Sequence, residues 1–150
     1  MAIKILIVEE CEAYVAACRD QLRKLGYSED AASDGVYIAV TVVDGKDAIT
    51  LAENKVHFNV VICALDLLCD FNGLDVLRRY RELGINIPFI VLVDGRSIHD
   101  LPTESDLLER TSANKKSKRI NVEVPTLQYI GSNLLTLGYA LEKALGTSVP

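Results

Sequence analysis

Short β-branched runs alternate with helical patterns along this chain, and that alternation restricts the fold more than any other feature of the sequence. Apolar runs rich in valine and isoleucine occupy Ile3–Val8, Val60–Leu65 and Phe89–Val93. The run Val60–Leu65 is apolar throughout, as expected for a central strand that is buried on both faces. Strands that alternate with helices predict an α/β domain in which crossover helices join parallel strands.

The segments between these runs complete the pattern over the first two thirds of the chain. Apolar residues that recur every three or four positions predict helices, which we place at Glu12–Leu25, Lys46–Asn54 and directly after Asn72-Gly73. A further β-branched run predicts a strand at Val36–Val43. In the helix after Gly73 the apolar side chains separate from Arg78 and Arg81, so we expect these arginines on a basic face.

The last third of the chain is less regular. Pro102 interrupts any helix around it, so we expect only a short fourth helix at Glu104–Arg110. Apolar residues alternate with polar ones in Ile120–Val124, which predicts the fifth strand. In Leu127–Leu145 leucine and isoleucine recur every three or four residues, which predicts one long amphipathic helix that ends at Gly146.

Length and composition set the broad class. The 150 residues suit one domain over residues 1–150 with a short tail at 146–150, and a net charge of −5 argues against a surface-wide nucleic-acid footprint. No apolar run reaches the length of a membrane helix, and the first residues lack a signal-peptide cleavage pattern. We therefore expect a cytoplasmic protein without membrane contact. Its cysteines form no C-x-x-C pair and are expected to be mostly buried, reduced thiols: Cys11, Cys18, Cys63 and Cys69.

The predicted topology also indicates where a ligand would bind. Right-handed crossovers between five strands and five helices give a doubly wound sheet, whose ligand crevice lies beyond the carboxyl ends of the strands. The residue pairs at those ends are Glu9-Glu10, Val43-Asp44, Leu65-Asp66, Val93-Asp94 and Val124-Pro125.

Several phrases, read in order, carry a family resemblance over nearly the whole chain: KILIVEE, VVDGKDAITLAE, FNVVICALDLL, NGLDVLRRYRELG, IPFIVLV and VEVP. In this order they resemble the receiver domain of bacterial response regulators, the CheY-like superfamily. The resemblance implies a flavodoxin-like (βα)5 fold with strand order 2-1-3-4-5 and a signalling protein that is not an enzyme. Relative to the family, the loops at about 28–35 and 109–119 are long, and the fourth helix is shortened or irregular.

The family's chemistry rests on a few side chains at the strand ends. An acidic pair after the first strand holds Mg²⁺, which prefers hard carboxylate oxygens. An aspartate at the end of the third strand accepts the phosphoryl group, whose charge needs compensating cations. The acidic pair falls on Glu9 and Glu10, so Mg²⁺ is a candidate ligand although no cofactor is required. Alternatively, Glu10 stabilises the start of the next helix through its charge.

The acceptor position carries no carboxylate. Counting forward from Phe58 places it on Ala64, and counting backward from Gly73 places it on Leu65. Asp66 is the next acid and the candidate acceptor, with a solvated loop acid as the alternative interpretation. Two residues along a strand span roughly 6.6 Å. That exceeds the separation of about 3–3.5 Å that reacting atoms need.

The remaining roles of the family also fall on unsuited residues. The threonine or serine that ends the fourth strand is replaced by Val93, and the lysine after the fifth strand by Val124, directly before Pro125. The aromatic residue that reports phosphorylation in many receivers falls near Asn121. A lone buried ammonium is costly, so losing the phosphate and its counter-charge together is consistent with a site rebuilt as core.

Two functions lead. The first is a pseudo-receiver, a phosphorylation-independent protein-interaction module in signal transduction. The second is an active receiver that is phosphorylated on Asp66 with Mg²⁺ at Glu9 and Glu10. A flavin or nucleotide site at the strand ends is disfavoured, because the acidic loop Glu9–Glu12 repels phosphate.

Partner contacts are the last expectation. A basic run in the 109–119 loop resembles a solvated loop and suits protein docking better than nucleic-acid binding, and it consists of Lys115, Lys116, Lys118 and Arg119. The face that carries the fourth helix, the fifth strand and the fifth helix departs most from the family. By analogy of fold, we expect a signalling partner or a second copy of the chain to bind there.

Overall fold

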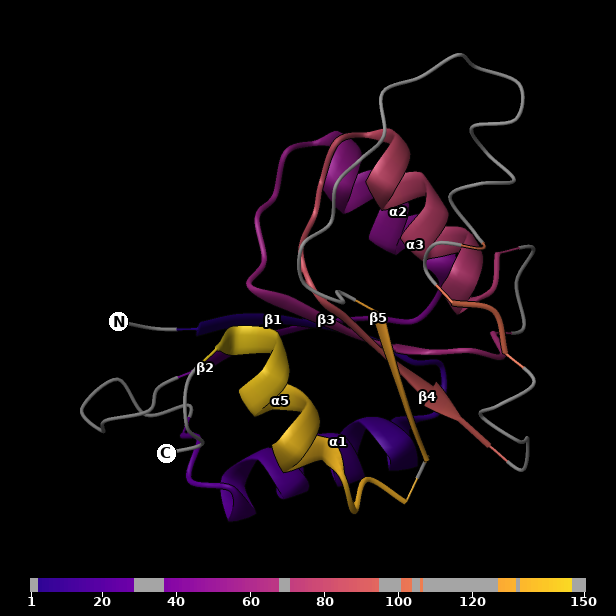
Figure 1. Cartoon of the computed structure of the whole chain (residues 1–150). Coiled ribbons are helices and arrows are strands. Elements are labelled where there is room, and N and C mark those ends of the chain that lie inside the picture. Colours follow the sequence, from indigo (N-terminus) through magenta and orange to yellow (C-terminus); the bar gives the residue numbers. More distant parts are fainter. Residues whose placement is uncertain are drawn as a thin grey trace.

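Five parallel strands form one sheet in the order β2-β1-β3-β4-β5 (Figure 1). The structure is a computed structural model that describes residues 3–28, 37–67, 71–94, 101–103, 106, 127–131 and 133–146. Its strands are β1 (Ile3–Val8), β2 (Tyr37–Val42), β3 (Val60–Ala64), β4 (Phe89–Val93) and β5 (Leu127–Gly131). The flavodoxin-like strand order that the sequence predicted is therefore confirmed.

Helices cover both faces of the sheet (Figure 1). In the described part of the chain they are α1 (Glu12–Lys24), α2 (Gly45–Glu53), α3 (Gly73–Glu82) and α5 (Leu137–Leu145). Helices α1 and α5 lie on one face of the sheet, and α2 and α3 lie on the other. The short helix predicted at Glu104–Arg110 falls outside the described residues apart from Asp106, so it stays a prediction. None of the described helices is long and apolar enough to cross a membrane.

The last strand and helix differ from the sequence prediction. The strand that pairs with β4 is Leu127–Gly131, in the register Phe89↔Leu127 to Val93↔Gly131, and not Ile120–Val124. The single long helix predicted over Leu127–Leu145 was also wrong, since α5 begins only at Leu137. Residues 120–124 themselves lie outside the described part of the chain. The spacing of Leu127, Ile130 and Leu134 looked helical by coincidence, because a strand and a tight turn place apolar residues at similar intervals.

The core consists of two apolar layers on opposite faces of the sheet. Alternate residues of β1 supply both layers: Ile5 and Ile7 pack with α1 and α5, whereas Leu6 and Val8 pack with α2 and α3. All of these side chains are at most 1% exposed. Successive side chains of a strand point to opposite faces, so a central strand covered on both sides must be apolar throughout.

Arg81 is buried rather than placed on an exposed basic face. Its side chain is only 3% exposed, and its guanidinium donates hydrogen bonds to the carbonyls of Ile85 (2.7 Å) and Ile87 (2.9 Å). The guanidinium also lies over the ring of Phe89, 5.5 Å from its centroid. The expected basic face is therefore wrong for Arg81, which ties the end of α3 to the segment that leads into β4.

The start of α3 is pressed against the end of β3. Asn72 caps the helix by accepting hydrogen bonds from the backbone amides of Leu74 and Asp75. A Cβ atom on Gly73 would lie 2.5 Å from the carbonyl oxygen of Ala64, closer than real Cβ contacts come. Only glycine fits this approach, which fixes where the chain after β3 passes the carboxyl edge of the sheet.

Candidate functional site

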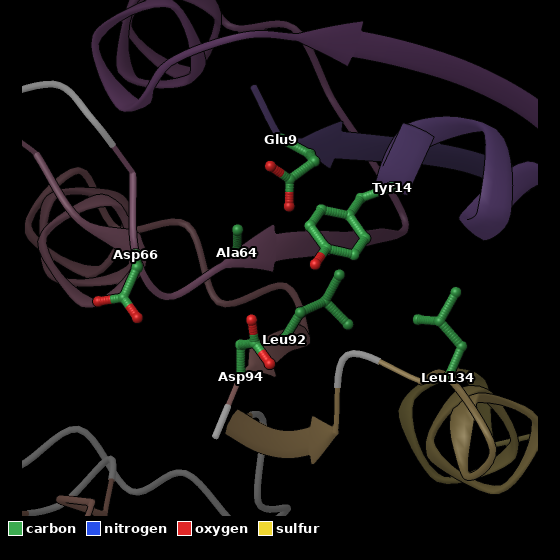
Figure 2. A pocket seen from close by; sticks show the side chains of 7 residues that line it. All are labelled: Glu9, Tyr14, Ala64, Asp66, Leu92, Asp94 and Leu134. Atoms are coloured by element: carbon green, nitrogen blue, oxygen red, sulfur yellow. The ribbon is translucent and has the colours of Figure 1, made fainter. Parts of the chain in front are cut away.

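A pocket of about 130 Å³ opens at the carboxyl edge of the sheet (Figure 2). Its lining comes from the ends of β1, β3 and β4, the first turns of α1 and the turn before α5. This is where the doubly wound topology predicted a crevice. The lining residues are Glu9, Tyr14, Ala64, Asp66, Leu92, Asp94 and Leu134.

Ala64, and not Leu65, lies at the pocket. Figure 2 shows the Ala64 methyl group on the side of β3 where the Glu9 carboxylate lies. Leu65 is 3% exposed and packs in a separate apolar cluster with Val91 and Val93. The sequence leaves Ala64 and Leu65 as alternatives for the acceptor position, and the structure places Ala64 at the pocket.

The two acids that follow β1, Glu9 and Glu10, differ in whether they line the pocket. One oxygen of Glu9 accepts hydrogen bonds from the backbone amides of Glu10 (2.8 Å) and Cys11 (3.1 Å), so the loop itself holds this carboxylate. Glu9 lines the pocket, whereas Glu10 is not among its lining residues. The structure thus brings only the first acid of the predicted pair to the site.

Asp66 and Asp94 reach the same pocket from the ends of β3 and β4. Both residues are exposed. In Figure 2 one carboxylate oxygen of Asp94 points toward the side of Ala64, while the carboxylate of Asp66 points away from it. Among the described residues, no three His, Cys, Asp or Glu side chains lie close enough together to hold a metal ion. Mg²⁺ usually binds through one or two carboxylates and keeps several waters, so a site at Glu9 and Glu10 stays a prediction.

An apolar layer replaces the hydroxyl at the end of β4. Val93 is 3% exposed and packs with Leu65 and Val91, so its side chain offers neither a hydrogen-bond donor nor a cation. Among the described residues that line the pocket, a side-chain hydroxyl is supplied by Tyr14 on α1, which is 44% exposed. Sequence reasoning missed Tyr14 because nothing in a helical pattern shows which exposed aromatic side chain turns toward a strand end.

The position of β5 changes which residues could carry the family's remaining roles. Val124 and Pro125 do not belong to β5, so the assignment of the lysine position to Val124 loses its basis. The lysine is still missing after the true strand, because residues 131–136 read GSNLLT. The predicted strand at Ile120–Val124 places the family's aromatic position near Asn121. The strand in the structure is Leu127–Gly131, and it carries an aromatic residue, Tyr129.

Tyr129 ties β5 to the chain that follows β4. Its hydroxyl donates a hydrogen bond to the carbonyl of Pro102 at 2.6 Å, and its ring packs against the cluster of Leu65, Val91 and Val93. Burial, and secondarily the negative charge of Asp106, raises the pKa of Tyr129 to about 12. The predicted docking loop at Lys115, Lys116, Lys118 and Arg119 falls outside the described residues.

Comparisons with known proteins identify the fold. No protein-family model and no curated protein matches the chain. Among solved structures, a receiver domain of a response regulator from Francisella is 15% identical, with a TM-score of 0.62 over 94% of this chain and 93% of that one. A putative response regulator from Chloroflexus aurantiacus is 17% identical, with a TM-score of 0.65 over 97% and 99% of the two chains.

A third structure is the receiver domain of a sensor histidine kinase from Pseudomonas aeruginosa, which has a magnesium ion in its active-site cleft. It is 19% identical to this chain, with a TM-score of 0.62 over 98% of this chain and 100% of that one. Identities this low establish a common architecture and not a common chemistry. The chain therefore has the fold of a response-regulator receiver domain.

Proposed function

We propose that the protein is a pseudo-receiver, a cytoplasmic signalling module that binds a protein partner without being phosphorylated and catalyses no reaction. The observation that supports this most is the methyl group of Ala64, which occupies the end of β3 beside Glu9. A receiver carries its acceptor carboxylate at the end of that strand. A methyl group can neither accept a phosphoryl group nor bind a metal ion.

The surroundings of Ala64 support the same conclusion. Phosphoryl transfer requires positive charge where negative charge develops. Val93 at the end of β4 is buried, and residues 131–136, at and directly after the end of β5, contain no lysine. Among the described residues that line the pocket, the charged groups are carboxylates, at Glu9, Asp66 and Asp94. Such a lining repels phosphate.

An active receiver that uses Asp66 is the second candidate, and one observation favours it. Asp66 lines the same pocket as Glu9 and is exposed, so an incoming phosphodonor can reach it. Its position beyond the end of β3 and the direction of its carboxylate, away from Ala64, oppose this function.

Intact-mass spectrometry after incubation with Mg²⁺ and acetyl phosphate separates the two candidates. We expect the mass to stay that of the unmodified chain, because no carboxylate occupies the acceptor position. Asp66→Ala and Asp94→Ala serve as matched variants, since both residues are exposed pocket acids at strand ends. Stoichiometric gain of one phosphoryl group that disappears only in Asp66→Ala would replace the pseudo-receiver with the active receiver.

The partner surface is proposed on the basic segment that contains Lys115, Lys116, Lys118 and Arg119. Its charge suits an acidic protein surface, and the net charge of −5 disfavours nucleic acid for the chain as a whole. Replacing all four residues by glutamine should abolish recovery of the partner in a pull-down. Unchanged recovery would remove this segment from the interface.

A further inference from the structure

Leu134, in the turn between β5 and α5, has an unusual backbone conformation. Its φ angle is +64°, in the left-handed region that leucine rarely adopts. Two hydrogen bonds hold the turn: the Leu134 amide donates to the carbonyl of Gly131 (3.0 Å), and the Leu134 carbonyl accepts from the amide of Leu137 (3.2 Å). A bulky residue stays in such a conformation only where its surroundings compensate for the strain.

The compensation here is burial of the Leu134 side chain. That side chain is 4% exposed and belongs to the core cluster between the sheet, α1 and α5, which also contains Cys18 and Leu137. It is also one of the residues that line the strand-end pocket (Figure 2). Leu134 thus belongs both to the lining of the pocket and to that core cluster.

We propose that Leu134 is a gate between the strand-end pocket and the core under α1 and α5. In the closed state described here, its side chain fills the boundary and its backbone is strained. In the open state the turn relaxes to an ordinary conformation, the side chain withdraws, and the pocket extends inward toward Cys18. This inference goes beyond the proposed function and does not depend on it.

Two features make opening a local event. Strain at Leu134 offsets part of the free energy gained by burying its side chain, so withdrawal costs less than for a leucine in a relaxed helix. The next residue, Leu135, is 80% exposed, so the outer side of the turn offers room for movement. On this exposed side of the turn, the Leu135 amide donates a hydrogen bond to Asn133 Oδ1 (3.2 Å).

The chain carries its own reporters for this motion. Cys18 and Cys63 are both buried, at 1% and 0% exposure, but they lie in the core clusters on opposite faces of the sheet. Opening at Leu134 uncovers the cluster of Cys18 and leaves that of Cys63 closed. Global unfolding uncovers both thiols equally.

The test is the rate at which iodoacetamide alkylates each thiol, measured by peptide mass spectrometry in the otherwise intact chain with Cys11→Ser and Cys69→Ser. We expect Cys18 to react at least tenfold faster than Cys63 under native conditions. Equal rates, or a faster Cys63, would overturn the gate.

A matched pair of variants supplies the second measurement. Leu134→Ala and Leu141→Ala each remove a buried leucine from the same cluster, but only Leu134 lines the pocket. We expect the ratio of Cys18 to Cys63 alkylation to rise at least tenfold further in Leu134→Ala and not in Leu141→Ala. An equal rise in both variants would assign the effect to general loosening of α5 and refute the gate. If a variant does not fold, the comparison of the two thiols in the parent chain decides alone.

Discussion

Ala64 illustrates how one side chain limits the chemistry of a strand end. The backbone around it is that of a receiver: β3 ends beside Glu9, and Gly73 lets α3 begin against the Ala64 carbonyl. The sequence placed these residues at one edge of the sheet, because the apolar runs of β1 and β3 are unambiguous. It could not decide between Ala64 and Leu65, because the direction of a side chain depends on the exact end of the strand and on the loop that follows.

Gly73→Ala tests the close approach at that edge. The added Cβ would meet the Ala64 carbonyl at 2.5 Å, so backbone must move, and we expect a loss of about 2–3 kcal/mol in unfolding free energy. Gly84→Ala is the control, because Gly84 has a φ of +79° but no atom within 4 Å of the added Cβ. That variant should lose only about 1 kcal/mol. If urea titrations gave a smaller loss of unfolding free energy for Gly73→Ala than for Gly84→Ala, the close contact between Gly73 and the Ala64 carbonyl would be refuted.

The left-handed conformation of Leu134 makes a prediction that is independent of any motion. Leu134→Ala and Leu134→Gly remove the same buried side chain, but only alanine retains the backbone strain. We expect the glycine variant to be more stable by about 1 kcal/mol. At Leu141, in the interior of α5, the order should reverse by a similar amount, about 1 kcal/mol. Thermal unfolding of the four variants measures both differences in stability. If the alanine variant were the more stable one at both positions, the left-handed conformation of Leu134 would be contradicted.

At the scale of elements, Arg81 shows where sequence patterns fail. Its position on α3 suggested a basic face, but its guanidinium is buried against two carbonyls between α3 and β4. Long cationic side chains can bury their length when the charged end finds acceptors. The spacing of apolar residues in the sequence does not show that the segment after α3 directs its backbone carbonyls toward Arg81.

Arg81→Met should therefore destabilise the junction of α3 and β4. Methionine keeps much of the side-chain volume but leaves the carbonyls of Ile85 and Ile87 without this donor, at a cost of about 2–4 kcal/mol. Arg79→Met is the control on the same helix, because Arg79 is 42% exposed in its ion pair with Glu82. Its loss should stay below about 1 kcal/mol. Urea titration compares the two, and equal losses would contradict the role of Arg81.

The strand β5 was misplaced because two weak signals competed. Ile120–Val124 alternates as a strand should, while Leu127–Gly131 continues the leucine spacing of α5 backward. Pairing with β4 determines which segment forms the strand, since each residue of Leu127–Gly131 pairs with a residue of Phe89–Val93. Tertiary pairing of this kind overrides local spacing and cannot be derived from one sequence.

Tyr129 on β5 makes the stability of the fold depend on pH in the alkaline range. Because burial raises its pKa to about 12 in the folded chain, the unfolded chain ionises first, near its usual value of about 10. The stability from this group is complete below about pH 10 and falls as the pH rises toward 12. Tyr129→Phe should flatten the decline in melting temperature over this interval, while Tyr139→Phe, at a 64% exposed residue, should not. Identical declines in both variants would refute the assignment.

At the scale of the whole molecule, the chain has the fold of a receiver domain, but its strand-end pocket differs from the site that phosphoryl transfer needs. The β2-β1-β3-β4-β5 sheet with helices on both faces is that of a receiver domain, and the resemblance in the sequence predicted its strand order but not the position of β5. The pocket at its carboxyl edge is lined by carboxylates and apolar side chains, where phosphoryl transfer needs a nucleophile, a metal site and a cation. This combination is what the proposed pseudo-receiver would have: the scaffold of a receiver without the groups that phosphoryl transfer needs.

The most direct test of this claim is the melting temperature with and without Mg²⁺ and beryllofluoride, a stand-in for a phosphoryl group bound to an aspartate. A working acceptor site that binds the pair at about 100 times its dissociation constant gains about 2.7 kcal/mol. In a chain of 150 residues that gain raises the melting temperature by about 5 °C or more. The pseudo-receiver predicts no change. A rise of this size that requires both Mg²⁺ and beryllofluoride would contradict it.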